Sequence, residues 1–342
     1  MLIKKKEIAL LLIFLSLVVT NLFAENYYFK RYDKENGLSQ QTVFCAVQDR
    51  RGFLWFGTKV GLNRFDGTKF KNYVADPEQP NSLPNNTVLA LAEAPDGSLW
   101  LGTSDGLCIY NPEKDTFAPF VSADLTIEGL IDNLVFDKQG NLWVINSKGT
   151  YCLDVKNGNH KFFAASDFFV PTGITVTQSG SVWVLGLDGN IYLFNPQRME
   201  FSSYTILTKE EKTKHILLYR ILECSNGDLV VTTDRIGARR FSPNNGEVKV
   251  LFSNDSQNNP IYIHTAIQRN KDEFWFGTES GIHIYQLNLG FIDHLQKSYN
   301  DAYSLSDNAV HMLLKDREEG IWVGTFFGGV NYLSSNNTLF DK

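Results

Sequence analysis

The sequence predicts an all-β protein, a seven-bladed β-propeller of four-stranded blades. Three observations support this fold class. A short phrase centred on tryptophan recurs along the chain, its copies are spaced like propeller blades, and apolar strand-like segments separated by turn residues surround each copy. A chain of 342 residues that is 43% hydrophobic and 20% charged also has the composition of a folded protein, so extensive disorder is excluded.

The recurring phrase contains all six tryptophans of the chain. It is clearest at residues 52–58 (GFLWFGT) and 97–103 (GSLWLGT). The spacing between Trp183 and Trp275 is about twice the others. A copy at 227–233, with Val230 in the tryptophan position, lies between them. The period is then 40–47 residues, which is typical of one propeller blade per repeat. The remaining copies centre on Trp143, Trp183, Trp275 and Trp322.

The second copy illustrates the four strands expected in each blade. We expect strands over 88–92, 98–103, 107–110 and 116–121, with a glycine-containing hairpin turn at 94–97 between the first two. The fixed register of the tryptophans favours packing between blades over a ligand cage. A second glycine should mark the reversal from the second to the third strand of each blade, at Gly61, Gly106, Gly149, Gly189, Gly237, Gly281 and Gly328.

Two segments lie outside the repeat. Residues 208–219 are the only helix-like stretch, and we expect an insertion between blades four and five. The N-terminal segment 28–33 resembles the outer strand expected at 70–76, so we expect it to be the fourth strand of blade seven. This arrangement closes the ring and leaves no blade edge unpaired. The short segment 338–340 is the alternative fourth strand.

The N-terminus predicts export. Residues 4–6 are lysines, 8–19 are apolar, and Ala24 is a small residue before a polar sequence, as in a secretory signal peptide. The apolar run is shorter than the ~20 residues of a membrane-spanning helix, although an uncleaved anchor is the alternative. The predicted organisation is a signal peptide over 1–24 and a propeller over 25–342, periplasmic and without a membrane span after cleavage.

The cysteines, histidines and charge exclude several classes of site. Cys45, Cys108, Cys152 and Cys224 are far apart in apolar runs, so we expect buried free thiols rather than disulfides. The six histidines do not cluster with cysteines or carboxylates along the sequence, and no metal or other cofactor is expected. A net charge of −6 without a basic stripe argues against nucleic acid as a partner.

The repeat resembles that of the two-component regulator propeller family. The pattern G-x-L-W-x-G-T-x-x-G-L, preceded by NGLS or NSLP, is clearest at 36–66 and 81–112; the last two copies also match well, and copies three to five are degenerate. The resemblance covers 25–342 and implies the periplasmic sensor region of a hybrid two-component histidine kinase. In that family such propellers commonly detect saccharides released from polysaccharides.

Sensors of this family typically carry two propellers, a β-sandwich, a membrane helix and a kinase. The sequence ends just after its seventh repeat. We therefore expect a sensor half, a truncated product or a free-standing propeller, with a second propeller or sensor chain as its protein partner.

The candidate ligand-binding residues lie in two sets of loops, those between the second and third strands and those that lead into the first strands. These loops converge on one face of a propeller, and here they include Asn133, Glu279 and His311. Arginine, amide and aromatic groups suit a saccharide, although any one of these residues could be an ordinary turn residue. The residues we expect to bind ligand are Lys59, Tyr219, Arg220, Arg235, His264, Phe326 and Phe327.

No catalytic motif is evident, so we expect a ligand-sensing propeller rather than an enzyme. Four carboxylates could converge on the ligand face, at Asp105, Asp188, Asp234 and Glu279. Their flanking sequences match no glycosidase motif and their spacing selects no pair. A propeller polysaccharide hydrolase or lyase and a protein-binding scaffold are the alternative functions.

Overall fold

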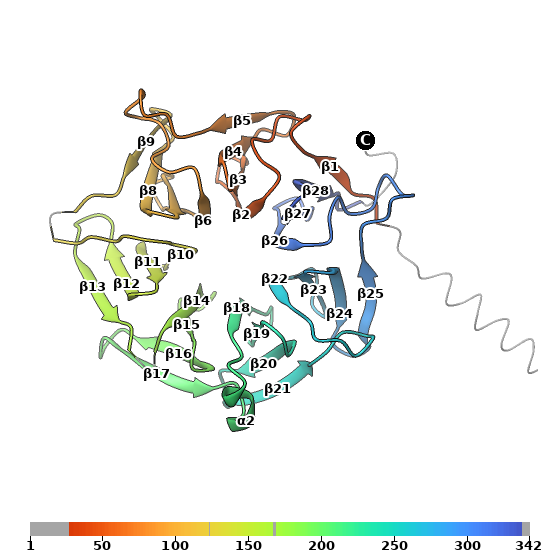
Figure 1. Cartoon of the computed structure of the whole chain (residues 1–342). Coiled ribbons are helices and arrows are strands. Elements are labelled where there is room, and N and C mark those ends of the chain that lie inside the picture. Colours follow the sequence, from red (N-terminus) through yellow and green to blue (C-terminus); the bar gives the residue numbers. More distant parts are fainter. Residues whose placement is uncertain (1–26, 123, 167–168, 337–342) are drawn as a thin grey trace, which may run out of the picture.

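The computed structural model describes residues 27–122, 124–166 and 169–336. They form seven four-stranded antiparallel sheets, arranged as blades around a central axis (Figure 1). The predicted seven-bladed β-propeller is therefore confirmed. The signal peptide expected over 1–24 and the alternative strand at 338–340 lie outside the described residues. No helix among the described residues is long and apolar enough to cross a membrane.

The first two strands of each blade form the inner half of the ring. The innermost strands surround the axis in Figure 1 and are β2 (Val43–Gln48), β6 (Val88–Glu93), β10 (Asn133–Phe136), β14 (Pro171–Val176), β18 (Leu218–Glu223), β22 (Ile263–Gln268) and β26 (Val310–Lys315). The second strands carry the tryptophan position and are β3 (Leu54–Thr58), β7 (Leu99–Thr103), β11 (Asn141–Asn146), β15 (Val182–Gly186), β19 (Leu229–Thr233), β23 (Glu273–Thr278) and β27 (Ile321–Thr325).

The last two strands of each blade form the outer half. The third strands are β4 (Gly61–Phe65), β8 (Gly106–Asn111), β12 (Gly149–Asp154), β16 (Asn190–Asn195), β20 (Ala238–Ser242), β24 (Gly281–Gln286) and β28 (Val330–Leu333). The outermost strands are β5 (Phe70–Tyr73), β9 (Thr116–Pro119), β13 (His160–Ala164), β17 (Glu200–Thr205), β21 (Glu247–Phe252), β25 (Gly290–Leu295) and, in blade seven, β1 (Lys30–Tyr32).

The N-terminal strand closes the ring, as the sequence predicts. β1 pairs antiparallel with β28, so blade seven contains both ends of the propeller. Tyr32 is buried at the junction between blades seven and one, where its ring stacks on Trp322 with centroids 5.8 Å apart. The positive-φ glycine of this blade is Gly329 (φ 76°) and not the predicted Gly328, and a Cβ at Gly329 would lie 2.4 Å from the Tyr32 carbonyl oxygen.

The tryptophans pack between blades, which confirms the structural role expected for them. Trp55 is 1% exposed, and its ring centroid lies 4.9 Å from that of Tyr110 in the next blade. Its indole N–H donates to Asp49 Oδ2 at 2.9 Å, while Asp49 Oδ1 accepts the backbone N–H groups of Arg51 and Phe53. One buried carboxylate therefore fixes both the hairpin turn and the tryptophan. The same hydrogen bond from an indole N–H to a carboxylate joins Trp143 to Asp137 and Trp322 to Asp316.

The insertion between blades four and five is a shorter helix than predicted. α2 (Lys209–Thr213) begins with a capping box between Thr208 and Glu211, and the chain joins β18 at Leu218, so the expected helix over 208–219 is wrong in its second half. The buried Arg239 of β20 donates to Glu211 Oε1 at 2.7 Å and so tethers the helix to blade five.

All four cysteines are free, as predicted. Cys108 and Cys224 are buried, whereas Cys45 and Cys152 are partly buried.

Candidate functional site

The innermost strands carry a recurrent β-bulge at the ends where the chain comes in from the preceding blade. Within the described residues, six of the seven innermost strands have this bulge, and β10 is the exception. A bulge leaves one residue outside the ladder and re-aims its side chain, and such bulges are frequent beside active sites. The bulged residues are Phe44, Leu89, Thr172, Tyr219, His264 and His311. Blades five, six and seven therefore place Tyr, His and His where the repeat elsewhere has Phe, Leu and Thr.

These three bulge residues and a neighbouring loop form a row of rings, which we call the aromatic arc. Tyr219 contacts His264 edge-to-face at 5.7 Å between ring centroids, and His264 stacks on His311 at 4.2 Å. His311 in turn lies 5.1 Å from Phe326, which packs against Phe327 at 4.7 Å. Phe326 and Phe327 come from the turn between β27 and β28, and Phe327 is 69% exposed. The arc therefore presents stacked ring surfaces at the ends of the innermost strands, which surround the axis (Figure 1).

Arg220 holds a guanidinium group beside the arc. It donates from Nε to the His264 carbonyl oxygen at 3.1 Å and from Nη1 to Asn133 Oδ1 at 3.4 Å, and so it bridges blades five, six and three. Its charge also lies over the Tyr219 ring, 5.2 Å from the centroid. The half-buried guanidinium makes no ion pair with a carboxylate among the described residues. A half-buried guanidinium without an ion-pair partner therefore lies beside the arc.

Glu279 contributes a carboxylate to the arc. This carboxylate lies beside the two histidines, His264 and His311. Its Oε1 lies 2.6 Å from His264 Nε2 and 3.7 Å from His311 Nε2, and its side chain is 54% exposed. Burial is the main reason that the pKa of His311 is lowered to about 4, with the neighbouring His264 acting in the same direction. His311 is therefore neutral near pH 7. The Nδ1 atom of His264 is buried without a hydrogen-bond partner among the described residues.

The structure thus brings together five of the seven predicted ligand-binding residues: Tyr219, Arg220, His264, Phe326 and Phe327. Arg235 contacts none of them. It pairs with Asp234 and donates to the carbonyl oxygens of Lys214 and His215, so it fixes the segment after α2. Lys59 is exposed in the turn between β3 and β4 of blade one, and its amino group has no contact with the arc.

Asn133, Glu279 and His311 lie in the loops considered from the sequence but are not among the seven residues expected to bind ligand. They come from blades three, six and seven, so no sequence motif unites them. A signal that could have identified His311 is the repeat register it shares with His264, because each is the second residue of its innermost strand, β22 or β26.

Two of the four carboxylates considered for catalysis have other partners. Asp188 accepts from Tyr192, and Asp234 is bound by Arg235 and by the backbone of Leu217. Neither contacts Glu279.

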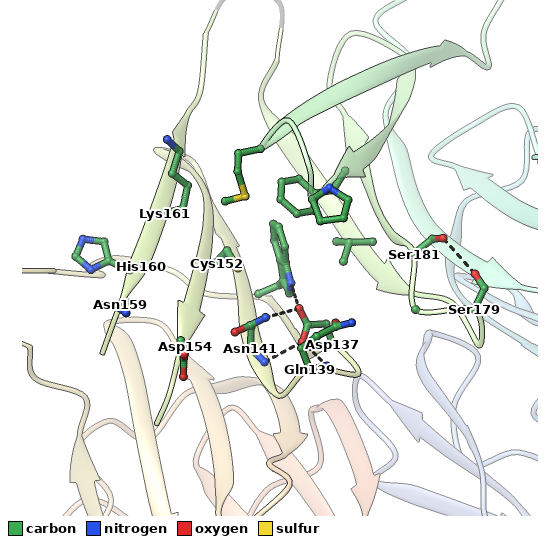
Figure 2. Close-up of a pocket in the computed structure, with 16 residues that line it drawn as sticks. Asp137, Gln139, Asn141, Cys152, Asp154, Asn159, His160, Lys161, Ser179 and Ser181 are labelled. Atoms are coloured by element: carbon green, nitrogen blue, oxygen red, sulfur yellow. Dashed lines mark hydrogen bonds between the residues drawn. The ribbon is translucent and has the colours of Figure 1, made fainter. Parts of the chain in front are cut away.

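A second hollow lies between blades three and four (Figure 2). It is lined by the turns between the first and second strands of these blades, at the opposite ends of the innermost strands from the bulges. Its volume is about 670 Å³, and its wall includes Trp143 and the turns around Asn141 and Ser181. The Asp137 carboxylate in this wall is already engaged by Trp143 and Asn141. Burial raises the pKa of Cys152 to about 12, so its thiol is not an activated nucleophile. The arc, with its unpaired guanidinium, is therefore the stronger candidate site.

Comparison with known families agrees with the repeat pattern. Residues 37–59, 82–105 and 304–327 match the family model described as two component regulator propeller. These segments cover the first half of blades one, two and seven. The chain carries two-component regulator propeller repeats. In the three matched repeats, the model runs through the innermost strand and the tryptophan strand to the turn that follows it, and in blade seven this region includes His311 and Phe326.

Several known proteins resemble the chain. A 53-residue segment is 49% identical to Histidine kinase P4 of Formosa agariphila, a match that covers 16% of this chain and 4% of that protein. The fold resembles an extracellular domain assigned to a hybrid two-component system of B. thetaiotaomicron, with a TM-score of 0.75, 25% identity, and coverage of 90% of this chain and 42% of that one. The chain thus spans less than half of these relatives. Virginiamycin B lyase of Staphylococcus aureus shares the fold alone, with a TM-score of 0.70, 12% identity, and coverage of 90% and 99%.

Proposed function

We propose that this protein is an extracytoplasmic sensor propeller that binds an acidic saccharide at the aromatic arc. The observation that carries the proposal is Arg220, a half-buried cation at the arc without a carboxylate partner among the described residues. A carboxylate or sulfate ester of a sugar would supply the missing negative charge and accept charge-assisted hydrogen bonds.

The ring surfaces beside Arg220 support a saccharide over a simple inorganic anion. A pyranose ring has an apolar face that packs against aromatic side chains, and its hydroxyls need polar partners. Tyr219 and Phe326 offer the ring surfaces. Polar atoms come from Asn133, which accepts from Arg220, and from Glu279, which lies beside His264 and His311. The exposed Phe327 extends the apolar surface outward.

The relatives support a sensory role. The extracellular domains that share this fold are assigned to hybrid two-component and one-component systems. We infer export through a signal peptide over 1–24 and a location in the periplasm. Because the chain spans less than half of those relatives, we also infer that signalling requires a further propeller or sensor segment as a partner.

A thermal-shift screen tests the proposal. The panel contains oligogalacturonides and sulfated galactan oligomers, with neutral malto- and xylo-oligosaccharides of equal length. We expect an acidic oligomer to raise the melting temperature, because a ligand that binds only the folded state stabilises it. Arg220→Gln should abolish the shift. Arg198→Gln is the matched control, since Arg198 is 74% exposed in the turn after β16, away from the arc.

Each other outcome of this screen contradicts the proposal in a specific way. Shifts with neutral oligomers alone would remove the acidic specificity. No shift with any oligomer would favour a protein-binding scaffold. Cleavage of an oligomer, detected by chromatography of the same samples, would favour the hydrolase or lyase alternative over the sensor.

A further inference from the structure

Three potential metal ligands lie together at the aromatic arc: His264, Glu279 and His311. One potential ligand atom of each residue lies within 4.8 Å of those of the other two. Glu279 Oε1 is 2.6 Å from His264 Nε2 and 3.7 Å from His311 Nε2. They come from β22, from the turn between β23 and β24, and from β26, so the site joins blades six and seven. Both imidazoles are aimed by β-bulges rather than by chance loop positions.

The donor set selects a class of metal. Two imidazole nitrogens and one carboxylate oxygen form the three-ligand set of catalytic-type zinc sites, in which a fourth position stays open to water or ligand. Ca²⁺ and Mg²⁺ prefer oxygen ligands, so they fit this set poorly. We propose that His264, Glu279 and His311 form a binding site for Zn²⁺ or a similar divalent transition-metal ion, with a fourth position open to water or ligand.

Binding requires small movements that the structure permits. Tetrahedral zinc with bonds of about 2.0–2.1 Å places its ligand atoms roughly 3.3 Å apart. The 2.6 Å contact between His264 and Glu279 must therefore lengthen, and the 3.7 Å contact of His311 must shorten. The stacked imidazoles must also turn apart about χ2, which is a broad torsion. Glu279 can follow because its side chain is 54% exposed in a turn.

The surroundings favour moderate rather than very tight affinity. The Nδ1 of His264 has no acceptor among the described residues, and outer-shell partners of this kind typically contribute 10–100-fold in metal affinity. The Arg220 guanidinium also opposes a dication, because its charge reaches His311. Glu279 and the nearby Asp307 offset part of that repulsion. We therefore expect a micromolar dissociation constant for Zn²⁺.

Titration calorimetry of the full chain without a histidine tag, stripped with a chelator and dialysed, tests the site. We expect one Zn²⁺ per chain with a micromolar dissociation constant, and no comparable heat from Ca²⁺. Glu279→Gln and His311→Gln should each weaken Zn²⁺ binding at least tenfold. His160→Gln is the matched control, because it removes an exposed imidazole of β13 and should leave the affinity unchanged.

Thermal melts distinguish the loss of the metal site from misfolding of a variant. Zn²⁺ should raise the melting temperature of the wild type and of His160→Gln, but not that of Glu279→Gln, whose exposed side chain is not needed for folding. Zn²⁺ affinity equal in wild type and Glu279→Gln, or no binding below about 100 μM, would overturn the proposal. Because no saccharide is present, the result is independent of the proposed sensor function.

Discussion

Closure of the ring by the N-terminal strand predicts that Tyr32 has a large effect on stability. Tyr32 is 7% exposed and contacts three aromatic rings, those of Trp322, Phe65 and Phe70, at centroid distances of 5.8, 5.1 and 5.9 Å. Two of these rings belong to blade one and one to blade seven. Tyr32→Ala would therefore leave a cavity at the junction between the first and last blades.

The expected loss follows from large-to-small substitutions in protein cores. Removing a buried aromatic side chain costs about 3–5 kcal/mol of unfolding free energy. At about 2 °C per kcal/mol for a domain of this size, the melting temperature should fall by about 6–10 °C. The control is Lys34→Ala in the exposed turn after β1, which should change it by less than about 1 °C.

The assay is differential scanning calorimetry of the mature protein, with urea unfolding followed by tryptophan fluorescence. Deletion of residues 25–35, which removes β1 entirely, should have a still larger effect and cause aggregation, because the edge of β28 becomes unpaired. If Tyr32→Ala and the deletion both melt like the parent, the N-terminal strand does not hold the ring closed and the reasoning is refuted.

Three further predictions concern the blades and the site. Asp316→Ala removes the acceptor of the Trp322 indole and of two turn N–H groups, so it should lower the unfolding free energy by about 3 kcal/mol. The control Asp105→Ala, in an exposed turn, should leave the unfolding free energy unchanged. Equal melting curves for the two variants would contradict the structural role of Asp316. Arg235→Ala should speed hydrogen exchange in the segment after α2 and leave saccharide affinity unchanged; weaker binding would instead restore Arg235 to the ligand site. The pKa of His283 is lowered to about 4 by burial, so the folded state disfavours its charged form; stability should fall by about 2–3 kcal/mol between pH 6.5 and 4, and His283→Gln should flatten this part of the profile measured by urea unfolding.

The fold was predictable because the residues that define each repeat lie close together in the sequence. Each tryptophan strand is followed by turn residues at a nearly fixed distance. The four strands expected in the second repeat, over 88–92, 98–103, 107–110 and 116–121, are observed with bounds that differ by at most two residues. Closure was also predictable, since the segment at β1 resembles an outer strand. The helix boundary was not, because residues 214–217 lead into β18 through contacts with Asp234 and Arg235 that no local pattern encodes.

The site was only partly predictable for a related reason. Loop position alone selected Tyr219, Arg220 and His264, but it also selected Arg235, whose guanidinium is used to fix a neighbouring segment. Which loop residues meet depends on the curvature of the ring and on the bulges of the innermost strands. His311 and Glu279 reach His264 only through that geometry.

The central claim, that Arg220 makes the aromatic arc a site for acidic saccharides, is tested most directly by titration calorimetry with a matched pair of ligands. The acidic oligomer that gives the largest thermal shift is compared with its carboxyl-reduced or desulfated form, which keeps the same ring and hydroxyls. A charge-assisted hydrogen bond contributes about 1.5–3 kcal/mol, so we expect the neutral form to bind roughly 10–150-fold more weakly. Arg220→Gln should bind both forms with the weaker affinity. Equal affinities of the two forms for the wild type would contradict the account.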